Sequence, residues 1–351
     1  MKKFAIIGCG GIGGYHLEHL VQFEDIELVG FCDLILSRAE GFVQKAGRGA
    51  AFSDYREMLD SVQPDAVFVC IPPNAHGVIE FEAIKRGIHL FVEKPVSIDL
   101  PLAKRIAAAI GEKGLISAAG FQCRYDNINE PAKEFIAGNP IVTIQGSRVG
   151  GVYAGPDWWR VRSASGGMLA EAGIHQMDMM RYLLGVEPAE VFSMGRRGIV
   201  TDDECVGYDI DDVSVTAIRF EDGAVATMTA GCYSTGGASW DSKITFGARD
   251  CRMEYELCRR TSLFGVTPES AAAAAETVKG DGTQRRSDDE KGIVYKNEND
   301  FGLLCDRTFV DAVITGDPSK IRSPYADAVK SLAFVLACNE SMDTGKPVRL
   351  S

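Results

Sequence analysis

The stretch FAIIGCGGIG, residues 4–13, decides the fold. Phe4–Ile7 is an apolar run, which is typical of a buried strand. Gly8, Gly10 and Gly13 follow it directly in a G-x-G-x-x-G arrangement, and the chain after them has a helical composition. Glycines at these positions allow a tight turn and let backbone N–H groups approach a pyrophosphate at a helix N-terminus. This order predicts a dinucleotide-binding βα unit rather than a glycine-rich turn without a ligand.

An acidic residue follows at the spacing that a dinucleotide requires. Asp33 ends the second predicted strand, 25 residues after Gly8. Its carboxylate can accept hydrogen bonds from the adenosine ribose hydroxyls and would repel a 2′-phosphate, so NAD is favoured over NADP. Arg38 lies nearby and either softens this preference or is a solvated helix residue. We expect the pyrophosphate to lie along Gly10-Gly11-Ile12-Gly13.

Strands and helices alternate over the first 120 residues. Such alternation indicates right-handed βαβ units and a doubly wound parallel sheet that is covered on both faces. We therefore predict an α/β Rossmann domain over residues 1–121. Its predicted strands are Phe4–Gly8, Glu27–Cys32, Ala66–Ile71, Ile88–Val92 and Leu115–Gly120.

The pattern changes after Arg124, where strands follow one another without intervening helices. The predicted strands are Val142–Val149, Val191–Arg196, Val213–Phe220, Ala224–Cys232, Lys243–Gly247 and Cys251–Tyr255. The predicted helices are Asn129–Ala137, Gly167–Leu184 and Tyr325–Thr344. Strands in succession predict an α+β domain with an open, mostly antiparallel sheet over residues 122–351. We expect Pro268–Asn299 to form a short helix and a mobile loop.

Composition and charge exclude several classes of protein. The chain has 351 residues, of which 46% are hydrophobic, and this suits about two globular domains. Its formal net charge is −12 without a basic block, so we expect neither a nucleic-acid nor a membrane partner. No apolar run reaches the roughly 18 residues of a membrane span. The apolar run after Met1-Lys2-Lys3 is too short for a signal peptide.

Cysteine usage points to a cellular compartment. Ten cysteines are scattered singly and none forms a C-x-x-C pair. This usage predicts a reducing, cytoplasmic location and no metal site. Cys9 lies inside the glycine loop, where it is either a small residue that fits or a regulatory thiol.

A charged tripeptide, Glu93-Lys94-Pro95, follows the strand Ile88–Val92. It stands at the carboxyl end of that strand, where ligands bind in open parallel sheets. Pro95 restricts Lys94 to extended backbone, and the bond between them could be cis. A lysine fixed near a nicotinamide would hydrogen-bond a substrate hydroxyl and stabilise a developing oxyanion. A surface turn capped by a salt bridge is the alternative.

Pro72-Pro73-Asn74 ends the preceding strand. Two prolines there direct the chain out of the sheet, toward the same edge at which Lys94 stands. The Asn74 side chain would either hold a cofactor ribose or cap the next helix.

A polar stripe lies on the predicted helix Gly167–Leu184. Glu171, His175, Asp178 and Tyr182 follow i, i+4, i+7, i+11 spacing and share one face. A solvated helix face is the simplest interpretation. A histidine one turn after a carboxylate is also a plausible general base with the residue that orients it. A metal held by this pair is a third option, although no further ligand cluster accompanies it.

These features together resemble the Gfo/Idh/MocA (glucose–fructose oxidoreductase / inositol dehydrogenase) family over nearly the full length of the chain. The resemblance is carried by Gly8–Gly13, Asp33, Pro72-Pro73-Asn74, Glu93-Lys94-Pro95 and the run from Gly166-Gly167 to Glu171 and His175. It implies a Rossmann domain and a second domain whose open sheet often forms the interface of dimers or tetramers. Pro72, Asn74, Glu93 and Lys94 are accordingly expected to join the glycine loop and Asp33 at the cofactor.

The resemblance also implies residue roles in catalysis. It makes Lys94 the catalytic lysine and His175 the general acid or base. Members of the family commonly have Asp four residues before that histidine, whereas this chain has Glu171. The charge is kept but the side chain is one methylene longer, which leaves the identity of the base open.

Three further residues are candidates for substrate contact. Arg124, in a segment that matches a common element of the family, would contact substrate or brace the two domains. Trp159 could stack on the apolar face of a sugar ring, and Arg160 could donate to hydroxyls or a carboxylate. Buried packing explains the tryptophan equally well.

We therefore expect an NAD-dependent oxidoreductase that acts on the CH–OH group of a sugar, inositol or related polyol. One alternative keeps the fold but uses tightly bound NAD transiently, in glycoside cleavage or epimerisation. Another is a regulator that binds NAD or sugar without reacting, although a regulator would not require Lys94, Glu171 and His175 together.

Overall fold

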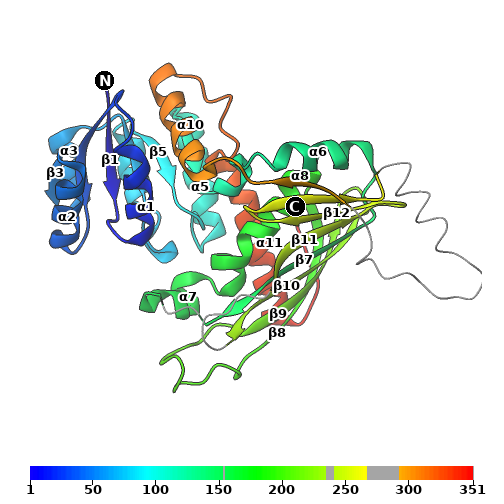
Figure 1. Cartoon of the computed structure of the whole chain (residues 1–351). Coiled ribbons are helices and arrows are strands. Elements are labelled where there is room, and N and C mark those ends of the chain that lie inside the picture. Colours follow the sequence, from blue (N-terminus) through cyan, green and yellow to red (C-terminus); the bar gives the residue numbers. More distant parts are fainter. Residues whose placement is uncertain (153–154, 235–240, 267–291, 351) are drawn as a thin grey trace, which may run out of the picture. The chain divides into compact units, whose positions relative to one another are not determined.

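The computed structural model describes residues 1–152, 155–234, 241–266 and 292–350 (Figure 1). The chain divides into two compact units, each assembled from separate stretches of sequence. The first unit contains Met1–Tyr125, Pro156–Glu171 and Asp300–Leu336, and the second contains Asp126–Gly155, Ala172–Asn299 and Ala337–Ser351. Within the described residues no helix is both long and apolar enough to cross a membrane.

The first unit is built on a parallel sheet of six strands in the order β3-β2-β1-β4-β5-β6. Every adjacent pair in this sheet is parallel. The order reverses between β1 and β4, and the carboxyl ends of strands at such a point form the ligand-binding edge of doubly wound sheets. The strands are β1 (Lys2–Ile7), β2 (Ile26–Cys32), β3 (Ala50–Phe52), β4 (Ala66–Val69), β5 (His89–Val92) and β6 (Ser117–Ala119).

Helices cover both faces of this sheet. On one side α1 contacts α2 and α10, and on the other α4 contacts α3 and α5. Their bounds are α1 (Gly11–Leu20), α2 (Leu36–Ala46), α3 (Tyr55–Val62), α4 (Val78–Lys85), α5 (Leu100–Glu112) and α10 (Phe301–Thr315). Because both faces are covered, the central strands are apolar throughout, as in Ala66–Val69, which is fully buried.

The second unit is built on a sheet of nine strands in the order β14-β13-β12-β11-β7-β10-β9-β8-β15. Only the β7–β10 pair is parallel, and the other pairs are antiparallel. The strands are β7 (Thr143–Gly151), β8 (Pro188–Arg196), β9 (Val213–Phe220), β10 (Val225–Ser234), β11 (Asp241–Gly247), β12 (Arg252–Glu256), β13 (Arg260–Phe264), β14 (Ile293–Lys296) and β15 (Val348–Arg349).

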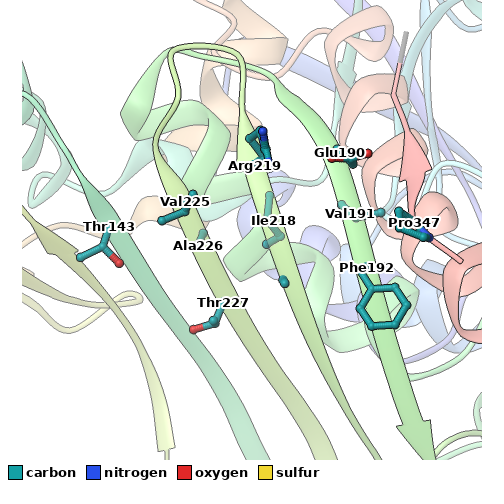
Figure 2. A pocket seen from close by; sticks show the side chains of 11 residues that line it. Thr143, Glu190, Val191, Phe192, Ile218, Arg219, Val225, Ala226, Thr227 and Pro347 are labelled. Atoms are coloured by element: carbon teal, nitrogen blue, oxygen red, sulfur yellow. The ribbon is translucent and has the colours of Figure 1, made fainter. Parts of the chain in front are cut away.

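The two faces of the nine-stranded sheet differ. Helices α6 (Asn129–Gly138) and α8 (Ile174–Leu184) contact its strands on one face. Residues of β9 alternate strictly between buried and accessible, so one side of this strand is uncovered. Val215 and Val225 are 44% and 51% exposed on that side. Phe192 and Val225 also line an open hollow over the four strands β7, β10, β9 and β8 (Figure 2).

Several elements of the chain differ from expectation. The segment Pro268–Asn299 was expected to form a short helix and a loop, yet Ile293–Lys296 forms β14 against β13. Residues 268–291, which include the expected short helix, lie outside the described residues. Helix α10 and strands β3, β13 and β15 were not predicted. The last helix, α11, runs from Tyr325 to Thr344 as predicted and is followed by Gly345 with φ +66°.

Candidate active site

The glycine loop between β1 and α1 has the shape that a pyrophosphate requires. Gly8 has φ +96°, and a Cβ on it would lie 2.1 Å from the carbonyl oxygen of Cys70. A Cβ on Gly13 would lie 2.1 Å from the carbonyl oxygen of Gly8, so neither position can carry a side chain. A Cβ on Gly10 or Gly11 would meet nothing within 4 Å. The start of α1 is therefore open on that side, and the loop fits a dinucleotide.

Asp33 ties the end of β2 to this loop. Its carboxylate accepts hydrogen bonds from the backbone N–H groups of Cys9 and Ile35, each at 2.9 Å. The Arg38 guanidinium lies 3.9 Å from the carboxylate on a largely exposed side chain. Each carboxylate oxygen has a second lone pair, so Asp33 can also accept a bond from a ribose hydroxyl. Ile12 lies exposed in the first turn of α1.

The Cys9 thiol is buried against β2. Its Sγ lies 3.5 Å from the carbonyl oxygen of Cys32, to which it donates. Burial, and then the charge of Asp33, raise the pKa of Cys9 to about 12. Because the thiolate is the reactive form, a thiol with this pKa is a poor nucleophile at neutral pH. The environment favours a small residue that fits over a regulatory thiol.

The chain leaves β4 at the same edge of the sheet. Pro73–Ala75 forms a short 3₁₀ helix preceded by Pro72, and Asn74 is exposed. The N-cap of α4 is Gly77, whose N–H donates to the Glu80 carboxylate at 2.6 Å. Asn74 therefore does not cap α4, and its contact with a cofactor ribose stays a prediction.

Lys94 contacts Glu171. The Lys94 ammonium donates to Oε1 of Glu171 at 3.1 Å and to the backbone carbonyl oxygen of Glu171 at 3.0 Å. The side chains are 13% and 15% exposed. The Lys94–Pro95 peptide bond is cis. The structure thus brings together the two charged motifs that stand 77 residues apart in the sequence.

Two glycines position Glu171. Gly166 and Gly167 have φ +80° and +87° and form the turn before a π-helical turn, Leu169–Gly173. A Cβ on Gly166 would lie 2.9 Å from Cγ2 of Ile98, so the turn packs closely on the segment that follows β5. Single π-helical turns are rare in proteins, and those that occur often lie at functional sites.

Lys94 is a cation at neutral pH. Burial alone would lower its pKa, but the carboxylates of Glu171 and Glu93 outweigh burial and raise the pKa above its ordinary value. An ammonium group can donate to an oxygen that gains negative charge, but it cannot accept the proton of a hydroxyl. A general base must therefore be another group.

His175 lies in the first turn of α8, in the second unit. The polar stripe that it belongs to is not a solvated face, because Asp178 is buried and His175 and Tyr182 are half-buried. The Lys133 ammonium lies 3.7 Å from the centroid of the Tyr182 ring. The approach of His175 to Lys94 stays a prediction.

Arg124 is buried within the first unit. Its Nη1 donates to the carbonyl oxygen of Arg322 at 2.7 Å and pairs with the Asp327 carboxylate at 2.6 Å. Its guanidinium also lies over the Phe121 ring. These contacts lie within the first unit and favour a structural role for Arg124 over a contact with substrate, whereas bracing of two domains by Arg124 stays a prediction.

The tryptophan segment is only partly accessible. Trp159 is 5% exposed, which fits a packing role. Arg160 pairs with Asp157 at 2.7 Å, and its side chain is 27% exposed. Of the two, Arg160 is the better candidate for a substrate contact.

Sequence reasoning missed a buried charged cluster beneath the glycine loop. His16 of α1 contacts Glu93 through one ring nitrogen and Asp306 of α10 through the other. The one signal in the sequence is that His16 comes three residues after Gly13. Asp306 lies 290 residues further along the chain, and no local pattern pairs the two.

Comparisons with known proteins agree with this geometry. Residues 2–121 match the oxidoreductase family with an NAD-binding Rossmann fold, and residues 133–253 match the GFO/IDH/MocA C-terminal domain. The chain is 30% identical to a myo-inositol 2-dehydrogenase of Thermotoga maritima, over 99% of this chain and 98% of that protein. It is 32% identical to a scyllo-inositol 2-dehydrogenase (NAD(+)) of Bacillus subtilis, over 65% of this chain and 66% of that protein.

A solved structure shares the fold over the full length. GenD2 from gentamicin A biosynthesis, in complex with NAD, has a TM-score of 0.79 and 22% identity, covering 100% of this chain and 96% of that chain. The parallel sheet with this glycine loop, together with the family match over residues 2–121, places the chain among the NAD-binding oxidoreductases. The chain belongs to the GFO/IDH/MocA oxidoreductase family.

Proposed function

We propose that this protein transfers a hydride between NAD and the CH–OH carbon of a sugar, an inositol or a related polyol. The observation that carries the proposal is the pairing of a cationic, partly accessible Lys94 with Glu171. Lys94 follows β5, which lies next to β4, the strand that leads to Pro72 and Asn74. Support comes from two relatives whose names state an inositol as substrate.

The proposed contacts for NAD lie along one edge of the parallel sheet. Gly10, Gly11 and Gly13 with Ile12 would bind the pyrophosphate at the start of α1, and Asp33 would accept a bond from the adenosine ribose. Pro72 and Asn74 follow β4 and Glu93 follows β5, at the edge where the remainder of a dinucleotide would lie. The Glu93 carboxylate binds His16 and the Lys94 N–H, so Glu93 would contact NAD through its backbone. Bound there, NAD supplies the hydride acceptor. The negative charge of Asp33 favours NAD over NADP.

The side chains divide the work of alcohol oxidation between a base and a cation. His175 accepts the hydroxyl proton while the carbinol C–H electron pair leaves as hydride, which leaves a carbonyl. Lys94 donates to the oxygen as negative charge develops on it. Glu171 fixes Lys94 and can accept bonds from neighbouring hydroxyls of a polyol. Arg160 is the further candidate for contact with hydroxyls, whereas burial of Trp159 and the contacts of Arg124 favour structural roles for those two side chains.

We also propose that two or four copies associate through the open face of the nine-stranded sheet. Exposed Val215 and Val225 on this face support an apolar contact between copies. Val215→Glu would place a charge in that contact. We expect it to lower the oligomer mass measured by light scattering, and an unchanged mass would contradict this interface.

The test of the proposed function is the near-ultraviolet absorbance of NADH. Purified protein with NAD is incubated with a panel of inositols, aldoses, sugar acids, other polyols and glycosides. We expect NADH from at least one alcohol. Silence across the panel, with NAD binding demonstrated by calorimetry, would reject net dehydrogenation and favour internal redox cycling or a regulator.

The matched variants are Lys94→Met and Lys113→Met. Lys113 is an exposed residue at the end of α5 and has no place in the site. Loss of a preorganised donor at a developing oxyanion lowers kcat about 100- to 1000-fold, which we expect for Lys94→Met only. Equal activity of the two variants would refute the role of Lys94.

A further inference from the structure

The imidazole of His16 lies between two buried carboxylates. Its Nδ1 lies 2.9 Å from both oxygens of Asp306, and its Nε2 lies 3.0 Å from Oε1 of Glu93. The side chains of His16, Asp306 and Glu93 are 4%, 0% and 4% exposed. The ring is thus held at both nitrogens by groups that lie out of reach of solvent.

Hydrogen-bond chemistry determines the charge of this ring. An ionised carboxylate only accepts, and a neutral imidazole donates from one nitrogen only. Both contacts are made at once if His16 is an imidazolium. Each carboxylate has a second donor as well, because Asp306 also accepts from Nδ1 of His19 at 2.7 Å and Glu93 accepts from the backbone N–H of Lys94 at 3.1 Å. Acceptors used in this way fit ionised carboxylates rather than a protonated carboxyl group.

Glu93 transmits this arrangement to Lys94. One oxygen of Glu93 binds His16, and the other binds the Lys94 backbone. A Cβ on Gly120 would lie 2.0 Å from Oε1 of Glu93, so the carboxylate is packed directly against the backbone there. Lys94 therefore starts from a fixed backbone position, from which its ammonium contacts Glu171.

We propose that His16 is a permanent imidazolium that clamps Glu93 to Asp306, and is thereby a positioning residue for Lys94. His16 also stands three residues after Gly13 in α1. The clamp thus fixes the helix that would bind the pyrophosphate to the strand end that bears Lys94. The catalytic consequence rests on the proposed function, whereas the charge state of His16 does not.

The surroundings of the ring support this charge state. Burial alone would lower the pKa of His16, but Asp306 and then Glu93 outweigh burial and raise it to about 10. The rings of Phe68 and Phe91, at centroid distances of 5.3 and 5.0 Å, exclude water from the remaining sides. The titratable groups around the ring are Asp306 and Cys305 of α10, Glu93 after β5, Cys70 after β4, and Tyr15 and His19 of α1.

The first test is the ¹⁵N NMR spectrum of histidine-labelled protein, with His16→Gln used to assign the signals. We expect both ring nitrogens of His16 to carry a proton at pH 7 and at pH 8.5. A neutral tautomer at pH 7 would overturn the proposal. Elemental analysis that finds one metal ion per chain would also overturn it, because a metal bound by His16, His19 and Asp306 would replace the proton on the His16 ring. This test needs neither a substrate nor a variant that is active.

The second test compares His16→Gln with His19→Gln. His19 contacts the same Asp306 but not Glu93, so it is the matched control. Trace acylation of lysines, read by mass spectrometry, reports the environment of Lys94 without a substrate. We expect Lys94 to label faster in His16→Gln and at the wild-type rate in His19→Gln. Equal labelling of Lys94 in both variants and in wild type would reject the positioning role.

Kinetics then link the clamp to the reaction. A displaced catalytic group lowers turnover by about tenfold to a hundredfold, so we expect His16→Gln to lower kcat by that factor. We expect the substrate KM and the activity of His19→Gln to stay close to those of wild type. Equal losses of kcat in the two variants would indicate general destabilisation and contradict the proposal. Failure of the proposed function itself appears separately, as a wild-type protein that is silent on the substrate panel.

Discussion

Glu93 and Lys94 are neighbours in the sequence after β5, but their charged contacts differ in burial. Glu93 is sealed beneath the sheet edge with His16 and Asp306, whereas Lys94 and Glu171 keep part of their surface accessible. The sealed contact has a partner for every nitrogen of the His16 ring. The Lys94–Glu171 contact holds the ammonium group that the proposed function places beside the substrate oxygen. A buried ion pair that cannot rearrange is suited to fix geometry, and an accessible pair is suited to bind a changing charge.

The largest effect is expected from breaking the sealed contact. Asp306→Asn removes the charge that faces both His16 and His19, and loss of one partner of a buried charge pair costs about 3 to 5 kcal/mol. Asp311→Asn on the same helix is the control, because Asp311 is exposed and its contact with Arg307 is expected to contribute at most about 1 kcal/mol. Urea unfolding measures both values. Equal values would show that the sealed contact is no stronger than a surface pair.

A smaller effect concerns pH. The pKa of His16 is raised to about 10 in the folded chain, against roughly 6.5 when unfolded. Its stabilisation is therefore complete below about pH 6.5 and is lost as pH rises through 10. Between pH 7 and 8.5 we expect the free energy of unfolding of wild type to fall by up to about 1.4 kcal/mol per pH unit relative to His16→Gln. Parallel pH profiles of the two proteins would contradict the raised pKa.

The smallest effect is expected for Asp33, at the end of β2, and concerns the choice between NAD and NADP. Asp33→Asn keeps an oxygen for the Cys9 N–H but removes the charge, and Arg38 is 3.9 Å away to pair with a 2′-phosphate. We expect the ratio of the NADP to the NAD dissociation constant to fall by about tenfold, equivalent to about 1.4 kcal/mol. Calorimetry with each cofactor measures the ratio. An unchanged ratio would remove Asp33 from cofactor selection.

Local patterns were sufficient for much of the fold. The apolar strands, the glycine loop and the alternation of strands with helices predicted the parallel sheet, because each is encoded within a few residues. Strand Val213–Phe220 and helix Tyr325–Thr344 have the predicted bounds. The mixed sheet was predicted as mostly antiparallel, which is confirmed, but its parallel β7–β10 pair joins strands with no local signal of their pairing.

Less of the site than of the fold could be predicted from the sequence. Its residues were chosen from motifs, and the contact of Lys94 with Glu171 agrees with that choice. The clamp was not predicted, because His16 and Asp306 come from distant helices, and a lone histidine in a helix resembles an ordinary core residue. The domain boundary after residue 121, the role of His175 and a cytoplasmic location stay predictions.

The measurement that tests the central claim most directly follows the hydride itself. The alcohol that the panel identifies is prepared with deuterium on its carbinol carbons, and the reduced cofactor is analysed by mass spectrometry. Direct transfer predicts one deuterium on each NADH formed, and almost no NADH with Lys94→Met. Reduced cofactor without deuterium, or no reduced cofactor in protein that binds NAD, would contradict the assignment of this chain as a dehydrogenase of CH–OH groups.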